Sequence, residues 1–175
     1  VTLVEGPGDI DAVPGLLYKI LRQHQKWNWQ VTTKQVKGLG ALRKNLEKFM
    51  VYSEGDADGG GILILLDLDD GCPKTEALTL ARQIRALNLS CPSAVVFACR
   101  EYEAWFLASI DAIVSQFNLF HKEITFTGDV ESIRGVKGWL TRQMPPGYAY
   151  KETTHQKVFT NLMNIDKVCQ RSRSF

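Results

Sequence analysis

The sequence predicts an α/β protein with a central, mostly parallel sheet, flanking helices and a C-terminal helical extension. Short apolar runs alternate with stretches whose apolar residues recur at helical spacing. One run, at 62–66, is continuously aliphatic, as in strands that parallel sheets bury on both faces. The 175 residues fit one domain, 1–175, with a core of about 1–120 and a basic extension of about 121–175.

The first part of the chain predicts two strands and two helices before the aliphatic run. A strand at 1–5 ends at a Gly/Pro turn, and Asp9 is a plausible N-cap for the helix that follows. We expect a second strand at 27–31 and a second helix at 39–52. Three consecutive glycines at 59–61 exclude regular structure just before the aliphatic strand.

The remainder continues the alternation and then becomes irregular. Helical spacing predicts a helix at 74–89, an apolar run predicts a strand at 93–100, and a further helix is expected at 101–117. Beyond Phe120 the pattern weakens to an irregular stretch with one short helix, followed by a last helix at 155–169. The order of elements is typical of a parallel sheet built from βα units.

Cysteines, apolar runs and charges restrict the class of protein. No apolar run approaches the roughly 20 residues of a membrane span and no signal-like leader opens the sequence, so we expect a cytoplasmic protein. Basic residues gather at 34–48 and 134–173, which suits a polyanionic partner, although solvated helix faces explain each group equally well. Without C-x-x-C pairs, the cysteines are expected to be free buried thiols: Cys72, Cys91, Cys99 and Cys169.

Acidic residues follow three of the predicted strands. Glu5 ends the first, Asp67 and Asp69 end the aliphatic strand, and Glu101 follows the next. Ligands of open parallel sheets bind outside the carboxyl ends of the strands, where these side chains would meet. Carboxylate oxygens suit Mg²⁺ or Mn²⁺, and a divalent cation would relieve their mutual repulsion. The sequence therefore predicts a metal site there.

Several of these acidic and basic residues also have ordinary structural explanations. Asp70 is either a further metal ligand or the cap of a solvated turn, and Asp9 is either a ligand or an N-cap. Glu101 and Glu103 either complete a second metal site or favour the first turn of a helix. Arg100 either contacts a phosphate or pairs with Glu103.

Two motifs resemble the Toprim domain of topoisomerases, bacterial primases, recombination-mediator proteins, a ribosomal-RNA maturase and the overcoming-lysogenisation-defect nucleases. They are the Glu-Gly at 5–6 and the Asp-x-Asp at 67–69. More narrowly, VEGPGDIDAVPGLL, LLDLDDGCP and REYEAWFLAS are similar to a family of small stand-alone Toprim-like proteins related to these nucleases. The resemblance implies a Rossmann-like fold in which Glu5, Asp9, Asp67 and Asp69 hold metal ions. Strand passage and priming are not expected, because the additional segments that they need are not visible.

The function implied by the resemblance is metal-dependent hydrolysis of nucleic-acid phosphodiester bonds, in DNA or RNA. Asp67 and Asp69 would anchor the metal, and Glu5 would bridge metals or act as the general base. Candidate phosphate contacts are Arg100, Lys137 and Lys157. A separate ATPase partner in prokaryotic defence or DNA processing, and a homo-oligomer, are also considered. The alternatives are a metal-dependent nucleic-acid binder without cleavage and an interaction module for the ATPase.

Overall fold

The computed structural model describes residues 1–120 and 124–175 and contains a four-stranded, all-parallel sheet. The order of strands is β2-β1-β3-β4, so the chain starts inside the sheet, adds one edge strand and then returns to build the other side. This confirms the predicted fold class. The strands are β1 (Thr2–Val4), β2 (Thr33–Gln35), β3 (Ile62–Leu68) and β4 (Ser93–Cys99).

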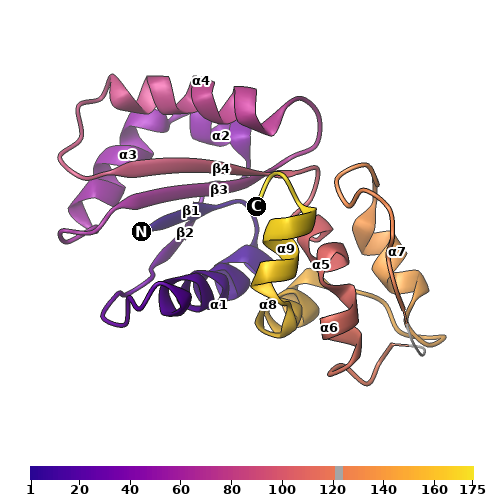
Figure 1. Cartoon of the computed structure of the whole chain (residues 1–175). Coiled ribbons are helices and arrows are strands. Elements are labelled where there is room, and N and C mark those ends of the chain that lie inside the picture. The colour runs from indigo at the N-terminus through magenta and orange to yellow at the C-terminus, as the bar shows by residue number, and fades with distance from the viewer. Residues whose placement is uncertain (121–123) are drawn as a thin grey trace.

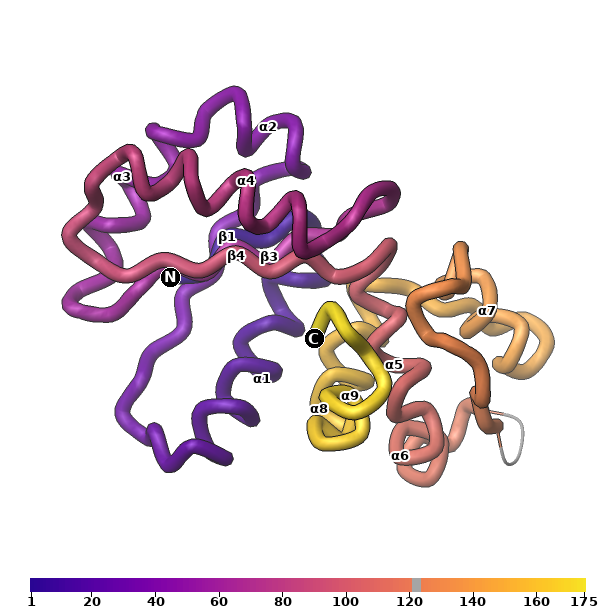
Figure 2. Tube along the Cα trace, turned by 45° about the horizontal axis from the view of Figure 1, so that its top comes forward, coloured from indigo at the N-terminus to yellow at the C-terminus, as the bar shows by residue number. Residues whose placement is uncertain are grey.

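Helices cover both faces of the sheet, as Figure 2 shows. Helix α1 (Pro7–Gln23) lies on one face. Helices α2 (Leu39–Lys44), α3 (Leu46–Gly55) and α4 (Pro73–Arg85) lie on the other. Two separate hydrophobic clusters follow from this arrangement, because alternate residues of β3 point to opposite faces.

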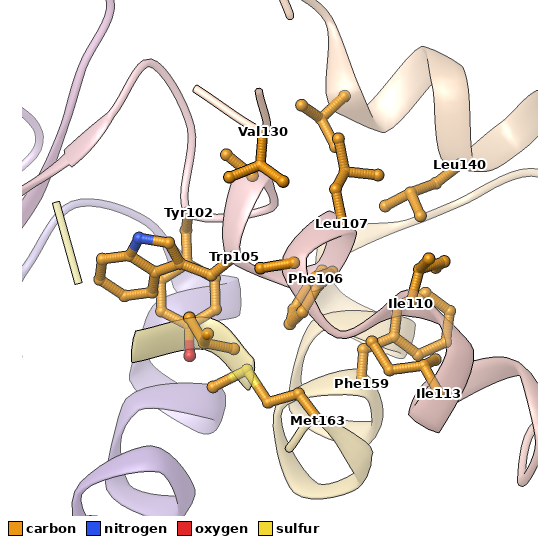
Figure 3. Packing of buried hydrophobic residues seen from close by; sticks show 14 of the residues in the cluster. Tyr102, Trp105, Phe106, Leu107, Ile110, Ile113, Val130, Leu140, Phe159 and Met163 are labelled. Atoms are coloured by element: carbon orange, nitrogen blue, oxygen red, sulfur yellow. The ribbon is translucent and has the colours of Figure 1, made fainter. Parts of the chain in front are cut away.

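The second half of the chain packs beside the carboxyl ends of the strands (Figure 1). Its core joins β1, α1 and β3 to the C-terminal helices through one continuous cluster, in which Phe106 and Phe159 lie edge to face at 5.5 Å (Figure 3). The elements are α5 (Ala104–Ala108), α6 (Ile110–Val114), α7 (Val136–Arg142), the π-helix η1 (Glu152–Gln156), α8 (Lys157–Leu162) and α9 (Ile165–Arg171).

Three of the predicted helices are divided in the structure. The helix expected at 39–52 breaks at Asn45 (φ −127°, ψ 28°), and the one expected at 101–117 breaks at Ser109 (φ −130°, ψ 27°). The Ser109 hydroxyl accepts a hydrogen bond from the Asn164 amide, so a tertiary contact holds this break. The helix expected at 155–169 is interrupted at 163–164, and the Asn164 side chain caps α9.

Two other predictions about local structure were wrong. The strand expected at 27–31 lies at Thr33–Gln35 instead, because only those residues pair with β1 while 22–30 are exposed. The four cysteines are free, as predicted, but Cys72 and Cys169 are exposed and the other two are only partly buried. The first residues of the predicted extension, 121–123, lie outside the described residues. No helix within the described chain has the length and apolar character needed to cross a membrane.

Candidate functional site

The carboxyl ends of β1 and β3 bring Glu5 and Asp67 to the same edge of the sheet. These strands are hydrogen-bonded neighbours, and Val4 is level with Leu65. Glu5 is therefore one residue out of register with Asp67, on strands that lie about 4.8 Å apart. Asp69 follows the end of β3 and is exposed. The topology thus gathers the three carboxylates of the two motifs.

Asp67 is held in place by a hydrogen bond from the backbone. Its Oδ1 accepts a hydrogen bond of 2.8 Å from the Tyr102 backbone amide, which fixes the side chain under the turn after β4. Burial raises the pKa of Asp67 well above its usual range, and the charges of Glu103 and Asp9 raise it further. A nearby cation would oppose both of these effects.

Glu5 lies against a glycine whose backbone only glycine adopts readily. Gly38 has a φ of +93°, and a Cβ at this position would come within 3.3 Å of Glu5 Oε1. Partial burial raises the pKa of Glu5, and the charges of Asp9 and Asp69 add to this. Burial is the larger cause, and the smaller contribution of Asp9 and Asp69 reflects repulsion between neighbouring carboxylates.

Asp9 is not the N-cap of α1 as expected, because Gly6 occupies that position. The Gly6 amide donates to Asp9 Oδ2 at 2.9 Å, so Asp9 is the third residue of the helix and reaches back to its cap. The other oxygen, Oδ1, accepts a hydrogen bond of 2.6 Å from Gln156 Nε2. Asp9 thereby connects the start of α1 to the π-helix η1.

Lys137 brings a positive charge into this group of acids. Its Nζ forms an ion pair with Glu152 and lies 3.9 Å from Glu103 Oε2. The pKa of Lys137 is raised because the neighbouring carboxylates outweigh the effect of its burial. The lysine predicted as a phosphate contact is therefore an internal counter-ion in the structure.

Glu103 is almost fully buried, with only 1% of its surface exposed. The Tyr150 hydroxyl donates a hydrogen bond of 2.9 Å to its Oε1. Burial raises the pKa of Glu103 to about 7, although Lys137 and Tyr150 favour the ionised form. Favouring the first turn of a helix, the structural role considered from the sequence, does not account for this burial or for the contacts with Tyr150 and Lys137.

Two other predicted residues, Glu101 and Arg100, have structural partners at the rim of the site. Glu101 Oε1 accepts hydrogen bonds from the amides of Gly135 and Val136 at the start of α7. Arg100 donates to the carbonyl oxygens of Glu131 and Asp69, so the pairing with Glu103 that was weighed is wrong.

Asp70 forms an exposed ion pair with Arg134, which holds the pKa of this carboxyl below its usual range. A metal role for Asp70 or for Glu101 Oε1 would therefore compete with these contacts, whereas Glu101 Oε2 is buried without a hydrogen-bond partner among the described residues.

Several cations of the basic extension form ion pairs within the protein, as Arg134 and Lys137 do. Lys167 pairs with Asp111, and Arg173 pairs with Asp129 and Glu131. Arg171 donates to backbone carbonyl oxygens. Lys157 is exposed on α8 and remains a candidate phosphate contact. Part of the extension's positive charge is thus used in contacts within the protein.

The donor chemistry fits a hard divalent cation, because Glu5, Asp67 and Asp69 offer only carboxylate oxygens. Among residues 1–120 and 124–175, no three His, Cys, Asp or Glu side chains form a ready ligand set for one ion. Binding would therefore require side-chain rotations that bring these oxygens together. The raised pKa values of Glu5 and Asp67 indicate that a cation would be electrostatically favoured.

Sequence reasoning did not identify Glu152, Tyr150, Tyr102 or Gln156 as parts of this site. All four reach it through contacts between segments distant in sequence, and no spacing rule connects these segments. The only local signal was the run of aromatic and charged residues at 148–152.

Comparison with known families gives one match. The family model described as Domain of unknown function (DUF4276) matches residues 4–175, which include every residue of the site. No curated protein and no solved structure matches the chain.

Proposed function

The chain belongs to the DUF4276 family, and we propose that it hydrolyses nucleic-acid phosphodiester bonds with the help of Mg²⁺ or Mn²⁺. The observation that carries this proposal is the convergence of Glu5 with Asp67 and Asp69 at one edge of the sheet. Carboxylates that repel one another in a partly buried site are costly without a cation, and a structural role does not require them to be close. The resemblance of their two motifs to the Toprim nucleases supports the same conclusion.

The side chains divide the chemistry between them. Asp67 and Asp69 would hold the ion, with Asp67 oriented by the Tyr102 amide. A bound divalent cation would supply charge neutralisation at the phosphate and activation of water. Glu5 would accept the proton of the attacking water, because a nearby cation keeps its carboxylate ionised. Asp9 would support the same ion from the first turn of α1.

The proposal also includes the setting in which the reaction takes place. We propose a cytoplasmic protein that acts on DNA or RNA in prokaryotic defence or DNA processing, with a separate ATPase as partner. Arg100, Lys137 and Lys157 are the proposed phosphate contacts, although Lys137 would first have to leave Glu152. Self-association into a homo-oligomer is a further part of the proposal.

A cleavage assay with plasmid, single-stranded DNA and RNA, in Mg²⁺, Mn²⁺ or EDTA, tests this function. Glu5→Gln keeps the volume of the side chain but removes its charge and its ability to accept a proton. We expect metal-dependent cleavage by the native protein and a loss of about 10²–10⁴-fold in the variant. Glu47→Gln, an exposed position on α3, is the matched control and should cleave normally.

The ion pairs of Lys137 favour a second candidate, a binding module without cleavage. An internal lysine already neutralises part of the acidic site, so the fold does not depend on a metal for this charge. If the native protein binds nucleic acid but cleaves none of the substrates, with or without an ATPase partner, the hydrolase proposal fails. The binding module then replaces it.

A further inference from the structure

Two tryptophans project from the loop between α1 and β2. The side chain of Trp27 is 68% exposed and that of Trp29 is 48% exposed, whereas tryptophan is usually among the most buried residues on average. Every residue at 22–30 is exposed, so this loop contributes little to the core. Such rings are costly to leave in water and are typical of binding surfaces.

The segment that carries these rings contains no acidic residue from Ala12 to Leu46. Two of its cations have ion-pair partners, Asp56 for Lys34 and Glu76 for Arg43. Within the described part of the chain, no ion pair is formed by the exposed residues Arg22, Lys26, Lys37 and Lys44. In the basic extension, by comparison, ion pairs are formed by Arg134, Lys137, Lys167 and Arg173.

The path of the chain connects the tryptophans to the candidate site. The Val31 amide donates to the Tyr18 hydroxyl at 3.2 Å, which ties the loop to α1. The chain then forms β2 at the edge of the sheet and reaches Gly38, which lies against Glu5. From Trp29 to Gly38 this path is at most about 30 Å long, as set by the extended length of a peptide.

There is also space beside one of the rings. Trp29 lines a cavity of about 810 Å³ at the amino ends of the strands, together with Leu17, Ile20 and Leu63. The lining is mixed and includes Asp56 and Asp58, and the apolar part next to the exposed indole leaves room for a planar group to stack on the ring. The loop is at the opposite end of the sheet from the C-terminal helices (Figure 1).

We propose that this surface binds single-stranded nucleic acid, with bases stacked on Trp27 and Trp29 and phosphates directed by Lys26 and Lys37 along β2 toward Glu5. This inference rests on the proposed function, because it names the substrate class of the same site. Stacking on aromatic rings beside a positively charged track is how proteins bind single strands without reading their sequence. A duplex keeps its bases stacked inside, so it offers the tryptophans much less.

Lys26 and Lys37 flank β2 and form no ion pair within the described part of the chain, whereas Lys34 on the strand itself is paired with Asp56. The two flanking lysines favour this ligand over a membrane surface. An interfacial anchor needs cations around its aromatic residues, but it gains nothing from a free lysine at the far end of an edge strand. Lys37 is at that far end, next to Gly38 and Glu5, where it would meet a phosphate that approaches the carboxylates. The arrangement therefore fits an extended polyanion.

Binding in EDTA tests the inference without cleavage. Fluorescein-labelled single strands of about 12 nucleotides, as DNA and as RNA, and the matching DNA duplex are titrated with protein. We expect the single strands to bind at least tenfold more tightly than the duplex and to quench tryptophan fluorescence. Trp27→Ala/Trp29→Ala should bind the single strands about 5- to 150-fold more weakly for each stacked ring that is lost.

Charge variants and controls complete the test. Lys26→Glu/Lys37→Glu should weaken binding and reduce its salt dependence. The control Arg82→Glu/Arg85→Glu, at two exposed positions of α4, should bind as the native protein does, as should Leu78→Ala on the same helix. Vesicles with anionic lipid serve as the competing ligand.

The outcomes separate this inference from the proposed function. Unchanged single-strand binding by the tryptophan variant, equal binding of duplex, or binding of vesicles alone overturns the inference, even if cleavage is normal. Loss of single-strand binding in the tryptophan variant supports it even if no cleavage is detected. If single-strand binding is lost in the tryptophan variant and the native protein shows no cleavage, only the hydrolase proposal fails.

Discussion

At the scale of single residues, the site combines mutually repelling carboxylates with one lysine, Lys137, that partly neutralises them. Lys137 pairs with Glu152 and lies 3.9 Å from Glu103, while Asp67 is held by the Tyr102 amide. The acidic motifs predicted which carboxylates would come together. The lysine was recognised as a candidate from its charge, but its role depends on the packing of α7, which sequence spacing does not encode.

The pKa of Glu103 gives a prediction about stability and pH. Its value of about 7 in the folded protein exceeds the 4.5 of an unperturbed glutamate, so the folded state binds more protons between these two pH values. Its contribution to the free energy of unfolding therefore falls as the pH rises from 4.5 to 7. We expect Glu103→Gln, measured by urea denaturation in EDTA, to gain roughly 3 kcal/mol relative to the native protein across this window. A difference that is constant with pH would contradict the raised pKa.

At the scale of elements, α1 approaches η1 so closely that only glycine fits at the contact. A Cβ on Gly8 would lie 2.1 Å from Gln156 Oε1 and 2.9 Å from Glu152 Cβ. The sequence predicted the helix that begins after Gly6 and a last helix at 155–169, but not their contact, because Gly8 and Gln156 are far apart in the sequence. The divided helices have the same origin, since tertiary contacts such as the Ser109–Asn164 hydrogen bond override local periodicity.

Gly8→Ala tests this contact. Overpacking in a well-packed region costs about 1–3 kcal/mol, and the added methyl group would also push Glu152 and Gln156 away from Lys137 and Asp9. We expect a lower free energy of unfolding in chemical denaturation. The control Gly40→Ala has no atom within 4 Å of the added Cβ and should instead stabilise by about 0.4–1 kcal/mol. Equal effects of the two substitutions would show that α1 and η1 are not in tight contact.

At the scale of the whole molecule, the sheet and the C-terminal helices share one core while the site lies where they meet. The parallel sheet followed from the alternation of apolar runs, because each buried strand needs a helix to return the chain. The position of the C-terminal region could not be predicted from the sequence, because its elements are short and its contacts are with residues of α1 and α5 far away in sequence. That region supplies Tyr150 and Glu152, which the motifs did not predict, and it places Lys137 among the carboxylates.

The most direct test of the central claim is a crystal of the protein soaked in Mn²⁺ and measured for anomalous scattering. We expect a peak bonded to carboxylate oxygens of Asp67 and Asp69 at about 2.1 Å, with Lys137 moved away from the ion. An Asp67→Ala/Asp69→Ala crystal should lose this peak. No peak at the carboxyl ends of β1 and β3, or a peak that persists in the variant, would contradict the account.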